Sequence, residues 1–297
     1  MYNTDKPYTE KVLNLVRTTR RAGYIPHSST DGIGTKGIYH WEQRTFRNAV
    51  LDALAMNLND LVVMRCIPAE LHDHIFIPKE DNEAIYEIVK NLAEECKKRK
   101  IVIDSGETSI HDNIRGLEIS VTINGLIKQK KSNRFIEEDN LIGIKSNGLH
   151  SNGFSKIREI FREEFKSEFV EPTTIYSDVL FNLIDRFDIH GMIHLTGGAY
   201  TRLRQLRKNQ DIIIFSHALI PQKIFYDIYE KGVLDEEMYR TFNCGIGFIL
   251  SVCEQNSKEI ISKLKNNGLE SCVIGKVVKG SGKVKIKSAF SQREIEL

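Results

Sequence analysis

Hydrophobic and polar positions along the chain fall into two successive halves, each of which mixes helical and strand-like periods. In the first half, residues 44–63 are apolar almost all round a helical wheel, which predicts a buried helix. Residues 80–100 carry a single apolar stripe, which is typical of an amphipathic helix. The other elements predicted here are a helix over 8–21, two short β-like runs within 23–40, and strands over 69–78, 101–108 and 116–127.

The second half repeats this mixture. Strands are predicted over 140–146, 191–195, 211–216, 243–252 and 272–279, and helices over 154–161, 173–188, 221–232 and 257–268. The polar stretch 128–139 separates the halves, so the predicted domains are 1–130 and 137–297. Strands that alternate with helices in both halves predict an α/β fold with α+β features, built as two layered domains.

Composition narrows the functional classes. The 297 residues are 41% hydrophobic and 28% charged, as in ordinary globular proteins. A formal charge of +2 is too balanced to indicate a nucleic-acid partner. Five cysteines form no C-x-x-C pair, so we expect free thiols in a cytoplasmic protein. The chain opens without an apolar signal segment and contains no apolar run of about eighteen residues, so no membrane contact is expected.

The first candidate binding motif is "STDGIGTKG", residues 29–37, which lies between the two β-like runs. Gly32 and Gly34 allow backbone N–H groups to approach an anion, and Lys36 adds a point charge. Asp31 stands directly before these residues. A polyphosphate would fit this arrangement, whereas a glycine-rich hairpin with an Asx-turn is the alternative.

The apolar helix carries acids that need partners. Asp52 and Asn59 lie seven residues apart, so they point to the same side of the helix, and Asp60 follows Asn59. A buried carboxylate without a partner is unfavourable, and either Mg²⁺ or Lys36 would serve as that partner. An ordinary buried salt bridge or a cap at the helix end is the alternative.

Further carboxylates follow at strand ends. "SGET" places Gly106, Glu107 and Thr108 at the end of an apolar strand, and Glu118 lies on the following strand. Side chains that gather at strand ends of an α/β sheet often bind ligands. Several carboxylates on one cleft suit a hard metal that carries phosphate, although each acid alone fits an exposed surface position.

Two turns of the second half have similar chemistry. "GLHSNGFS", residues 148–155, stands at the mouth of a helix, where free N–H groups and the helix dipole favour an anion. His150 is placed to transfer a proton or to hold a phosphate. "HLTGG", residues 194–198, repeats the arrangement, and plain capping motifs are the alternative. The turn residues are Ser151, Asn152 and Gly153 in the first motif, and Thr196, Gly197 and Gly198 in the second.

Together these motifs resemble the aminoimidazole ribonucleotide synthetase family of the PurM-like ATP-dependent superfamily. "DGIGTK", "NDLVV", "SGET", "GLHSNGFS" and "HLTGG" occur in the family's order and spacing, and "EEMYRTFNCGIGFIL", residues 236–250, is similar to its own signature. The resemblance implies a homodimer in which the N-terminal halves pair as a β-barrel, while each C-terminal half is a mixed sheet covered by helices. It implies ATP and Mg²⁺ as cofactors. The implied reaction closes formylglycinamidine ribonucleotide to aminoimidazole ribonucleotide, with release of ADP and phosphate.

The resemblance also assigns site residues. Asp31, Asp60 and Glu107 match metal positions, and Glu118 stands where the family usually has Asp. His150 and Lys36 are the candidate catalytic residues, for proton transfer and for offsetting phosphate charge. The implied nucleotide-binding set is Asp31, Gly32, Gly34, Lys36, Asn59, Asp60, Gly106, Glu107, Thr108, Ser151, Asn152, Gly153, Thr196, Gly197 and Gly198.

The chain departs from the family pattern in its leader. "RTTRRAGYIPHSSTDG" occupies the place of the family's glycine-rich loop, and "SGET" replaces the usual G-G-E-T. The alternative functions are therefore a catalytically weakened nucleotide-binding regulator, or another ATP-dependent kinase or synthetase of the superfamily.

Overall fold

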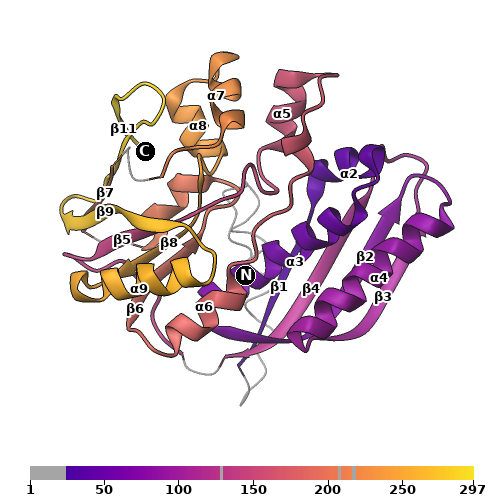
Figure 1. Cartoon of the computed structure of the whole chain (residues 1–297), viewed down its shortest axis with the longest axis horizontal. Helices are drawn as coiled ribbons and strands as arrows, with labels where there is room; N and C mark the ends of the chain where they lie inside the picture. The colour runs from indigo at the N-terminus through magenta and orange to yellow at the C-terminus, as the bar shows by residue number, and fades with distance from the viewer. Residues whose placement is uncertain (1–24, 128–129, 207–208, 216–218) are drawn as a thin grey trace.

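The computed structural model describes residues 25–127, 130–206, 209–215 and 219–297, arranged around two β-sheets (Figure 1). One sheet has four strands and the other has seven, and helices pack on both. This arrangement confirms the predicted mixed α/β architecture. The helix predicted over 8–21 lies outside the described residues.

The four-stranded sheet comes from the first half of the chain. Its strands are β1 (Pro26–Gly32), β2 (Cys66–Ile77), β3 (Val102–Ile110) and β4 (Glu118–Ile127), in the order β1-β4-β2-β3. β2 and β3 are parallel and joined by α4 (Asn82–Arg99), while the other neighbours are antiparallel. α3 (Phe46–Val63) and α4 lie on one face of this sheet (Figure 1). The two helices predicted over 44–63 and 80–100 are thus confirmed.

Strand register gives this sheet one apolar and one polar face. Leu71, Ile75 and Val121 point toward the helices and are buried. Their strand neighbours point the opposite way, because successive side chains alternate. They form what we call the polar face, made by Thr30, His72, His74, Ser105, Glu107, Ser120 and Thr122.

The second β-like run predicted within 23–40 is wrong, because this segment is helical. After β1 the chain forms the 3₁₀ turn η1 (Gly34–Lys36) and the short helix α2 (Gly37–Gln43). Tyr39 and His40 are adjacent and both buried, at 6% and 0% exposure. A strand would turn two such neighbours to opposite faces, whereas a helix packed in a cleft between two layers can bury both.

The seven-stranded sheet comes from the second half and has the order β11-β10-β7-β9-β5-β8-β6. Its strands are β5 (Asn140–Lys145), β6 (Ile189–His194), β7 (Gln210–Ile214), β8 (Ile246–Val252), β9 (Ser271–Lys279), β10 (Val284–Lys287) and β11 (Glu294–Glu296). The helices are α5 (Phe154–Phe161), α6 (Ser177–Ile184), α7 (Lys223–Glu230), α8 (Asp235–Thr241) and α9 (Glu254–Asn266), with 3₁₀ turns η2 (Ser167–Val170) and η3 (Ala199–Leu206).

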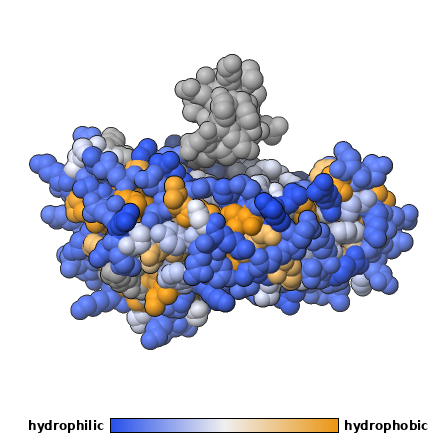
Figure 2. Space-filling model, turned by 90° about the horizontal axis from the view of Figure 1, so that it is seen from above, coloured by the Kyte–Doolittle hydropathy of each residue, from blue (hydrophilic) through white to orange (hydrophobic). Residues whose placement is uncertain are grey.

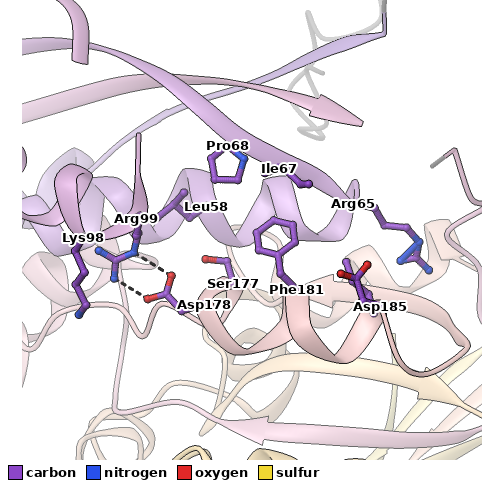
Figure 3. Close-up of a pocket in the computed structure, with 11 residues that line it drawn as sticks. Leu58, Arg65, Ile67, Pro68, Lys98, Arg99, Ser177, Asp178, Phe181 and Asp185 are labelled. Atoms are coloured by element: carbon purple, nitrogen blue, oxygen red, sulfur yellow. Dashed lines mark hydrogen bonds and ion pairs between the residues drawn. The ribbon is translucent and has the colours of Figure 1, made fainter. Parts of the chain in front are cut away.

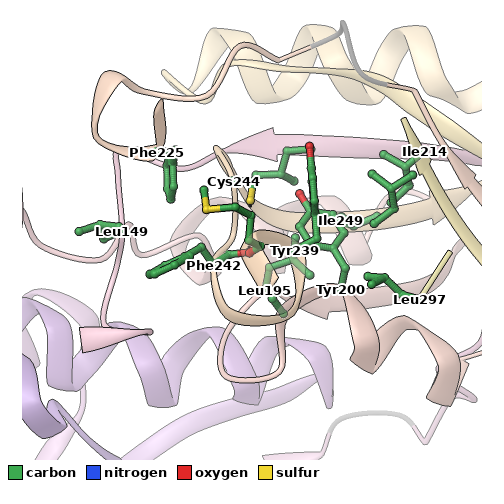
Figure 4. Close-up of a cluster of buried hydrophobic side chains, with 14 of the residues drawn as sticks. Leu149, Leu195, Tyr200, Ile214, Phe225, Tyr239, Phe242, Cys244, Ile249 and Leu297 are labelled. Atoms are coloured by element: carbon green, nitrogen blue, oxygen red, sulfur yellow. Dashed lines mark hydrogen bonds between the residues drawn. The ribbon is translucent and has the colours of Figure 1, made fainter. Parts of the chain in front are cut away.

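Both faces of the larger sheet are buried. An aromatic-rich cluster that includes Tyr200, Phe225 and Phe242 packs on one face (Figure 4). Leu180 of α6 and Ile260 of α9 pack on the other. This double burial explains why these strands read as continuous apolar runs, as in β8, where every residue is buried.

Three elements of the second half are absent from the sequence prediction, and one helix is shorter than expected. α8, β10 and β11 are short, and charged residues make up at least half of each, so their hydrophobic periods are weak. The helix predicted over 173–188 begins at Ser177, because residues 171–176 form no regular structure and are bonded to α3 instead. Asn59 Oδ1 accepts hydrogen bonds from the backbone N–H groups of Tyr176 and Ser177, so a neighbouring helix supplies the N-terminal cap.

The surface and the thiols agree with the composition. The face in Figure 2 is mostly hydrophilic, with small separate apolar patches. Within the described residues, no helix combines the length and the apolar character needed to span a bilayer. All five cysteines are free, as predicted.

Candidate functional site

The predicted motifs of both halves meet where α3 passes between the two sheets. Thr35 Oγ1, in the loop after β1, lies 3.3 Å from Ser155 Oγ at the start of α5. The two turns of the second half also face each other, since a Cβ built on Gly197 would lie 3.7 Å from Asn152 Oδ1. Three segments that are remote in sequence therefore border one site.

Asp31 and Asp60 form an acidic rim on this site. His194 Nδ1 lies 3.3 Å from Asp60 Oδ1, and the Asp31 carboxylate accepts a hydrogen bond of 2.8 Å from Gly32 N. Asp31 belongs to the exposed residues, yet partial desolvation of its carboxyl group raises its pKa, and the charge of Asp60 adds to this. The charges of His194 and Arg202 lower the pKa of Asp31 but do not outweigh these effects, so an added positive charge near Asp31 would be favourable.

Glu118 joins the same region from β4. Its Oε1 accepts a hydrogen bond of 3.3 Å from Gly34 N, and a Cβ on Gly32 would come within 2.5 Å of the same oxygen. Burial is the main cause that raises the pKa of Glu118, and the charge of Asp31 raises it further. A side chain at position 32 would therefore displace the Glu118 carboxylate, and Gly34 has a φ of +56°, which favours glycine.

Glu107, with Gly106 and Thr108, lies elsewhere. These residues belong to β3, which β2 and β4 separate from β1, and Glu107 pairs with His74 on the polar face. Within the described chain, no group of three or more His, Cys, Asp or Glu side chains is arranged to hold a metal. The structure of a single chain therefore brings Asp31, Asp60 and Glu118 to one region and leaves Glu107 apart.

Asp52 is fully buried at the centre of a polar cluster that joins the two halves. From the first half, it accepts hydrogen bonds from Lys36 Nζ at 2.9 Å and His40 Nε2 at 2.8 Å. From the second half, it accepts from Ser151 Oγ at 2.8 Å and from both N and Oγ1 of Thr173 at 2.6 Å. The predicted partnership with Lys36 is confirmed, in the form of a buried salt bridge. We call these five residues the Asp52 cluster.

The electrostatics of this pair are dominated by burial. Desolvation lowers the pKa of Lys36, and the negative charge of Asp52 opposes that shift. Desolvation alone would raise the pKa of Asp52, but Lys36 and His40 outweigh it and hold that pKa far below its usual range. Lys36 Nζ also donates to the carbonyls of His150 and Glu171, at 2.9 and 2.5 Å. Its three N–H groups are all engaged, so direct contact with a phosphate would require it to leave these partners.

His150 is buried and its ring has no hydrogen-bond partner. The residue is 1% exposed, and neither Nδ1 nor Nε2 has a partner among the described residues. Its φ is +60°, which is unfavourable for a residue with a side chain. Burial lowers its pKa well below the usual value, and the His194 and Lys36 charges act in the same direction, so the ring is neutral at pH 7. An unsatisfied group on a strained backbone is typical of functional positions.

Asn59 and the neighbouring rings complete the site. Asn59 Nδ2 donates to Thr174 O at 2.9 Å and lies 3.3 Å from His194 Nε2. The ring of His150 lies 6.0 Å from that of Tyr176 and 6.3 Å from that of His194. Among the predicted binding residues, Asn59 therefore contacts the second half rather than open space.

A well-formed cavity lies apart from this chemistry. It has a volume of about 770 Å³ and lies between α3, α4 and α6, where Arg99 pairs with Asp178 (Figure 3). Its described lining contains none of the predicted site residues. The convergence of motifs, rather than cavity size, locates the candidate site.

Sequence reasoning missed four residues here. His40 follows Lys36 by one helical turn, a spacing that could have linked both to Asp52 if the segment had been predicted as a helix. Arg202 donates to Thr196 Oγ1, and its charge acts on Asp31. Gly247 allows close packing, since a Cβ there would lie 2.6 Å from His150 Cε1. Thr173 and Gly247 carry no local signal, because only the fold brings them to the site.

Comparison with known proteins agrees with this arrangement. Residues 21–127 match the family model "AIR synthase related protein, N-terminal domain", and residues 137–287 match "AIR synthase related protein, C-terminal domain". The phosphoribosylformylglycinamidine cyclo-ligase of Saccharolobus solfataricus is 33% identical over 85% of this chain and 79% of its own length. That of Clostridium perfringens strain 13 is 35% identical over 88% of this chain and 83% of its own length.

Solved structures share the fold. The Escherichia coli hydrogenase maturation protein HypE superposes with a TM-score of 0.71 at 19% identity, over 96% of this chain and 88% of that one. A HypE structure in complex with ATP has a TM-score of 0.70 at 16% identity, over 99% of this chain and 90% of that one. At these identities the likeness concerns the fold alone.

Proposed function

The chain belongs to the AIR synthase related protein family, and on that premise we infer that it is an ATP-dependent phosphoribosylformylglycinamidine cyclo-ligase of purine biosynthesis. The observation that carries this conclusion is identity of 33% and 35% with curated cyclo-ligases across 85% and 88% of the chain. The enzyme converts formylglycinamidine ribonucleotide and ATP into aminoimidazole ribonucleotide, ADP and phosphate. Its free cysteines support the cytoplasmic location that we propose.

We propose that the ATP phosphates lie at the convergence of the three motif loops. The loop after β1, with Gly32 and Gly34, borders this site on one side, and the two turns of the second half border it on the other. The ATP-bound HypE structure has the same fold, which supports a nucleotide site in this fold. The turn residues proposed to contact the nucleotide are Ser151, Asn152, Gly153, Thr196, Gly197 and Gly198.

The residues present fit a magnesium ion that arrives with the nucleotide. Mg²⁺ in such sites uses one or two carboxylates together with phosphate oxygens, so it needs no complete protein cage. Asp31 and Asp60 lie close enough for the charge of one to raise the pKa of the other, and that repulsion is relieved by an added cation. We propose that these two residues hold the ion, with Glu118 near them. When bound, the ion would offset charge on the transferring phosphoryl group.

The chemistry needs activation of a poor leaving group. Transfer of the γ-phosphoryl group to the amide oxygen of the substrate turns that oxygen into a phosphate leaving group. The amidine nitrogen of the same molecule then attacks the carbon, the C–O bond breaks, phosphate departs and the five-membered ring closes. Because both reacting groups are tethered, holding the right conformer can supply about 7 kcal/mol or more of the barrier.

We propose that His150 accepts the proton that the attacking nitrogen loses. Its ring is neutral at pH 7 and both nitrogens are without partners, so it can act as a base. His150→Asn should then lower the rate of ring closure by about 100-fold. Unchanged turnover would remove His150 from this role.

The decisive experiment measures both products. Purified protein should release ADP from MgATP only when formylglycinamidine ribonucleotide is present, and diazotisation should detect the aminoimidazole that forms. Absent or substrate-independent ADP release would contradict the cyclo-ligase and point to the weakened regulator or to another kinase of the superfamily.

We also propose a homodimer in which the four-stranded sheets of two copies meet through their polar faces. The position of Glu107 on this face supports the idea, because pairing would let Glu107 serve the site of the other copy. Sedimentation should give twice the mass of 34.1 kDa. Mixing inactive Asp60→Asn and Glu107→Gln chains should restore about a quarter of the activity, since half of the dimers would be mixed and each would have one intact site. A monomer, or no complementation, would contradict this arrangement.

A further inference from the structure

One side of α3 carries a row of buried or half-buried polar residues that hold the second half of the molecule. Asn48, Asp52 and Asn59 are spaced by four and seven residues, so they share a helix face. Asn48 Nδ2 donates to Val170 O at 2.9 Å, and Asn59 Nδ2 donates to Thr174 O at 2.9 Å. Asp52 differs from both asparagines, because it also reaches the turn that carries His150.

The ring of His150 depends on its backbone for its placement. Its two nitrogens have no hydrogen-bond partner among the described residues, so no side-chain bond fixes the ring. The backbone around it is held from both sides, since Lys36 Nζ donates to His150 O and Ser151 Oγ donates to Asp52 Oδ1. A φ of +60° is unfavourable for histidine and persists only where the surroundings impose it.

We propose that Asp52 is a positioning residue, which holds the His150 turn in its left-handed conformation through Lys36 and Ser151. The proposal rests on the role of His150 given under the proposed function. Asp52 touches neither substrate nor nucleotide in this scheme, so it is not itself catalytic.

Removal of the carboxylate charge would weaken both of these restraints on the turn together. Lys36 would lose its charge partner and turn away from the carbonyl of His150. Ser151 and Thr173 both donate to Asp52 Oδ1, and in Asp52→Asn this oxygen would belong to a neutral amide, which is a weaker acceptor than a carboxylate. The strained φ of His150 would then relax, and the ring would move relative to the bound substrate.

The test compares three variants of the full-length protein. Asp52→Asn keeps the shape of the side chain and removes its charge. Asn48→Ala is the matched control, because it deletes a hydrogen bond from the same helix to the same segment without touching the His150 turn. Lys36→Met combined with Asp52→Asn removes both charges, so a folded protein lacking the pair is available if the single variant unfolds.

Two readouts separate positioning from general damage. The first is kcat for ring closure, together with KM for ATP, in protein whose fold is verified by urea unfolding. The second is the NMR signal of the His150 ring in histidine-labelled protein, which is identified by its loss in His150→Asn. The second readout does not depend on activity.

Asp52→Asn, or the double variant, should lower kcat by about 100-fold, because a displacement of the His150 ring by about 1 Å has an effect of this size. KM for ATP should change by less than about twofold. The His150 signal should shift. Asn48→Ala should keep kcat within about twofold and leave that signal in place.

Two results would overturn the proposal. One is a folded Asp52 variant with kcat near wild type and an unmoved His150 signal; the other is Asn48→Ala lowering kcat as much as Asp52→Asn. A wild-type protein that closes no ring would refute the proposed function instead. In that case the NMR signal would still decide whether Asp52 holds His150.

Discussion

Asp52 and Asp31 are acids of the same region, and they differ in how completely their surroundings satisfy them. Asp52 is fully buried and accepts from five donors, which hold its pKa far below the usual range. Asp31 is an exposed residue and accepts a hydrogen bond from Gly32 N. Partial desolvation of its carboxyl group, together with the charge of Asp60, raises the pKa of Asp31. A carboxylate that already accepts several hydrogen bonds has no free capacity to bind a ligand. A carboxylate with few partners is stabilised when a cation binds to it. The Asp52 cluster therefore organises the fold, and the acidic rim is available for binding.

The largest effect should come from breaking the Asp52 cluster. Lys36→Met leaves a carboxylate buried without its cation, and such a loss lowers the free energy of unfolding by about 3–5 kcal/mol. Urea unfolding measures this change. The double variant Lys36→Met with Asp52→Asn should lose less than the single variant, because the unpaired charge is gone. A loss below about 1 kcal/mol for Lys36→Met would show that the cluster contributes little to the fold.

Substitutions in the acidic rim should change the affinity for MgATP rather than the free energy of unfolding. Asp60→Asn should weaken MgATP binding by about 10- to 100-fold, which corresponds to one lost charge-assisted contact, and leave the affinity for metal-free ATP nearly unchanged. Titration calorimetry with and without EDTA separates the two. Asp104→Asn is the control, because Asp104 is an exposed acid of β3 at 62% and lies outside the rim. Equal effects in both variants would contradict a specific metal role for Asp60.

This comparison also shows what the sequence can predict. The salt bridge between Lys36 and Asp52 follows from an acid on an apolar helix, since such a charge must find a partner. The convergence of the motif loops follows from their positions at strand ends and turns. Thr173 could not be predicted, because nothing local distinguishes it and only the packing of residues 171–176 on α3 brings it to Asp52.

Local pattern failed where tertiary packing decided the structure. The segment of α2 has too few residues for its period to separate a strand from a helix, and burial of both Tyr39 and His40 settles it only in the folded protein. Glu107 has the residue type of a metal ligand, but it lies on β3, and β4 and β2 separate that strand from β1. Sequence thus predicts the type of chemistry at each motif, whereas strand order determines which motifs meet.

The ring nitrogens of His150 have no hydrogen-bond partner among the described residues. Protonation of this ring should make the free energy of unfolding depend on pH. Burial depresses its pKa in the folded protein below the ordinary value of about 6.5, so below that pH the unfolded chain binds a proton that the folded chain does not. Stability is therefore lost on acidification from pH 6.5, by about 1.4 kcal/mol per pH unit for one proton. His40 acts in the same direction.

His150→Asn should make this slope shallower by up to about one proton between pH 6.5 and 5, as measured by urea unfolding at several pH values. His27→Asn is a useful comparison. Burial also lowers the pKa of His27, but by less than that of His150, and His27 lies outside the Asp52 cluster. An unchanged slope in His150→Asn would mean that the imidazole is protonated as readily in the folded protein as in the unfolded chain.

The smallest effect should come from an ion pair near the surface, Arg99–Asp178, which joins the two halves. Arg99 Nη2 donates to Asp178 Oδ2 at 2.8 Å (Figure 3), but Asp178 is 41% exposed and Arg99 keeps Glu95 as a partner at 2.6 Å. Asp178→Asn should therefore reduce the free energy of unfolding by less than about 1 kcal/mol, and 1 M salt should remove most of the difference. The Lys36–Asp52 pair lies within the first half and is fully buried, whereas the Arg99–Asp178 pair joins the halves near the surface, so burial is the property expected to separate their contributions. The contrary outcomes are a free energy of unfolding that falls as much in Asp178→Asn as in Lys36→Met, or one that falls by an amount that salt does not change. Either result would contradict the conclusion that burial determines how much an ion pair stabilises this protein.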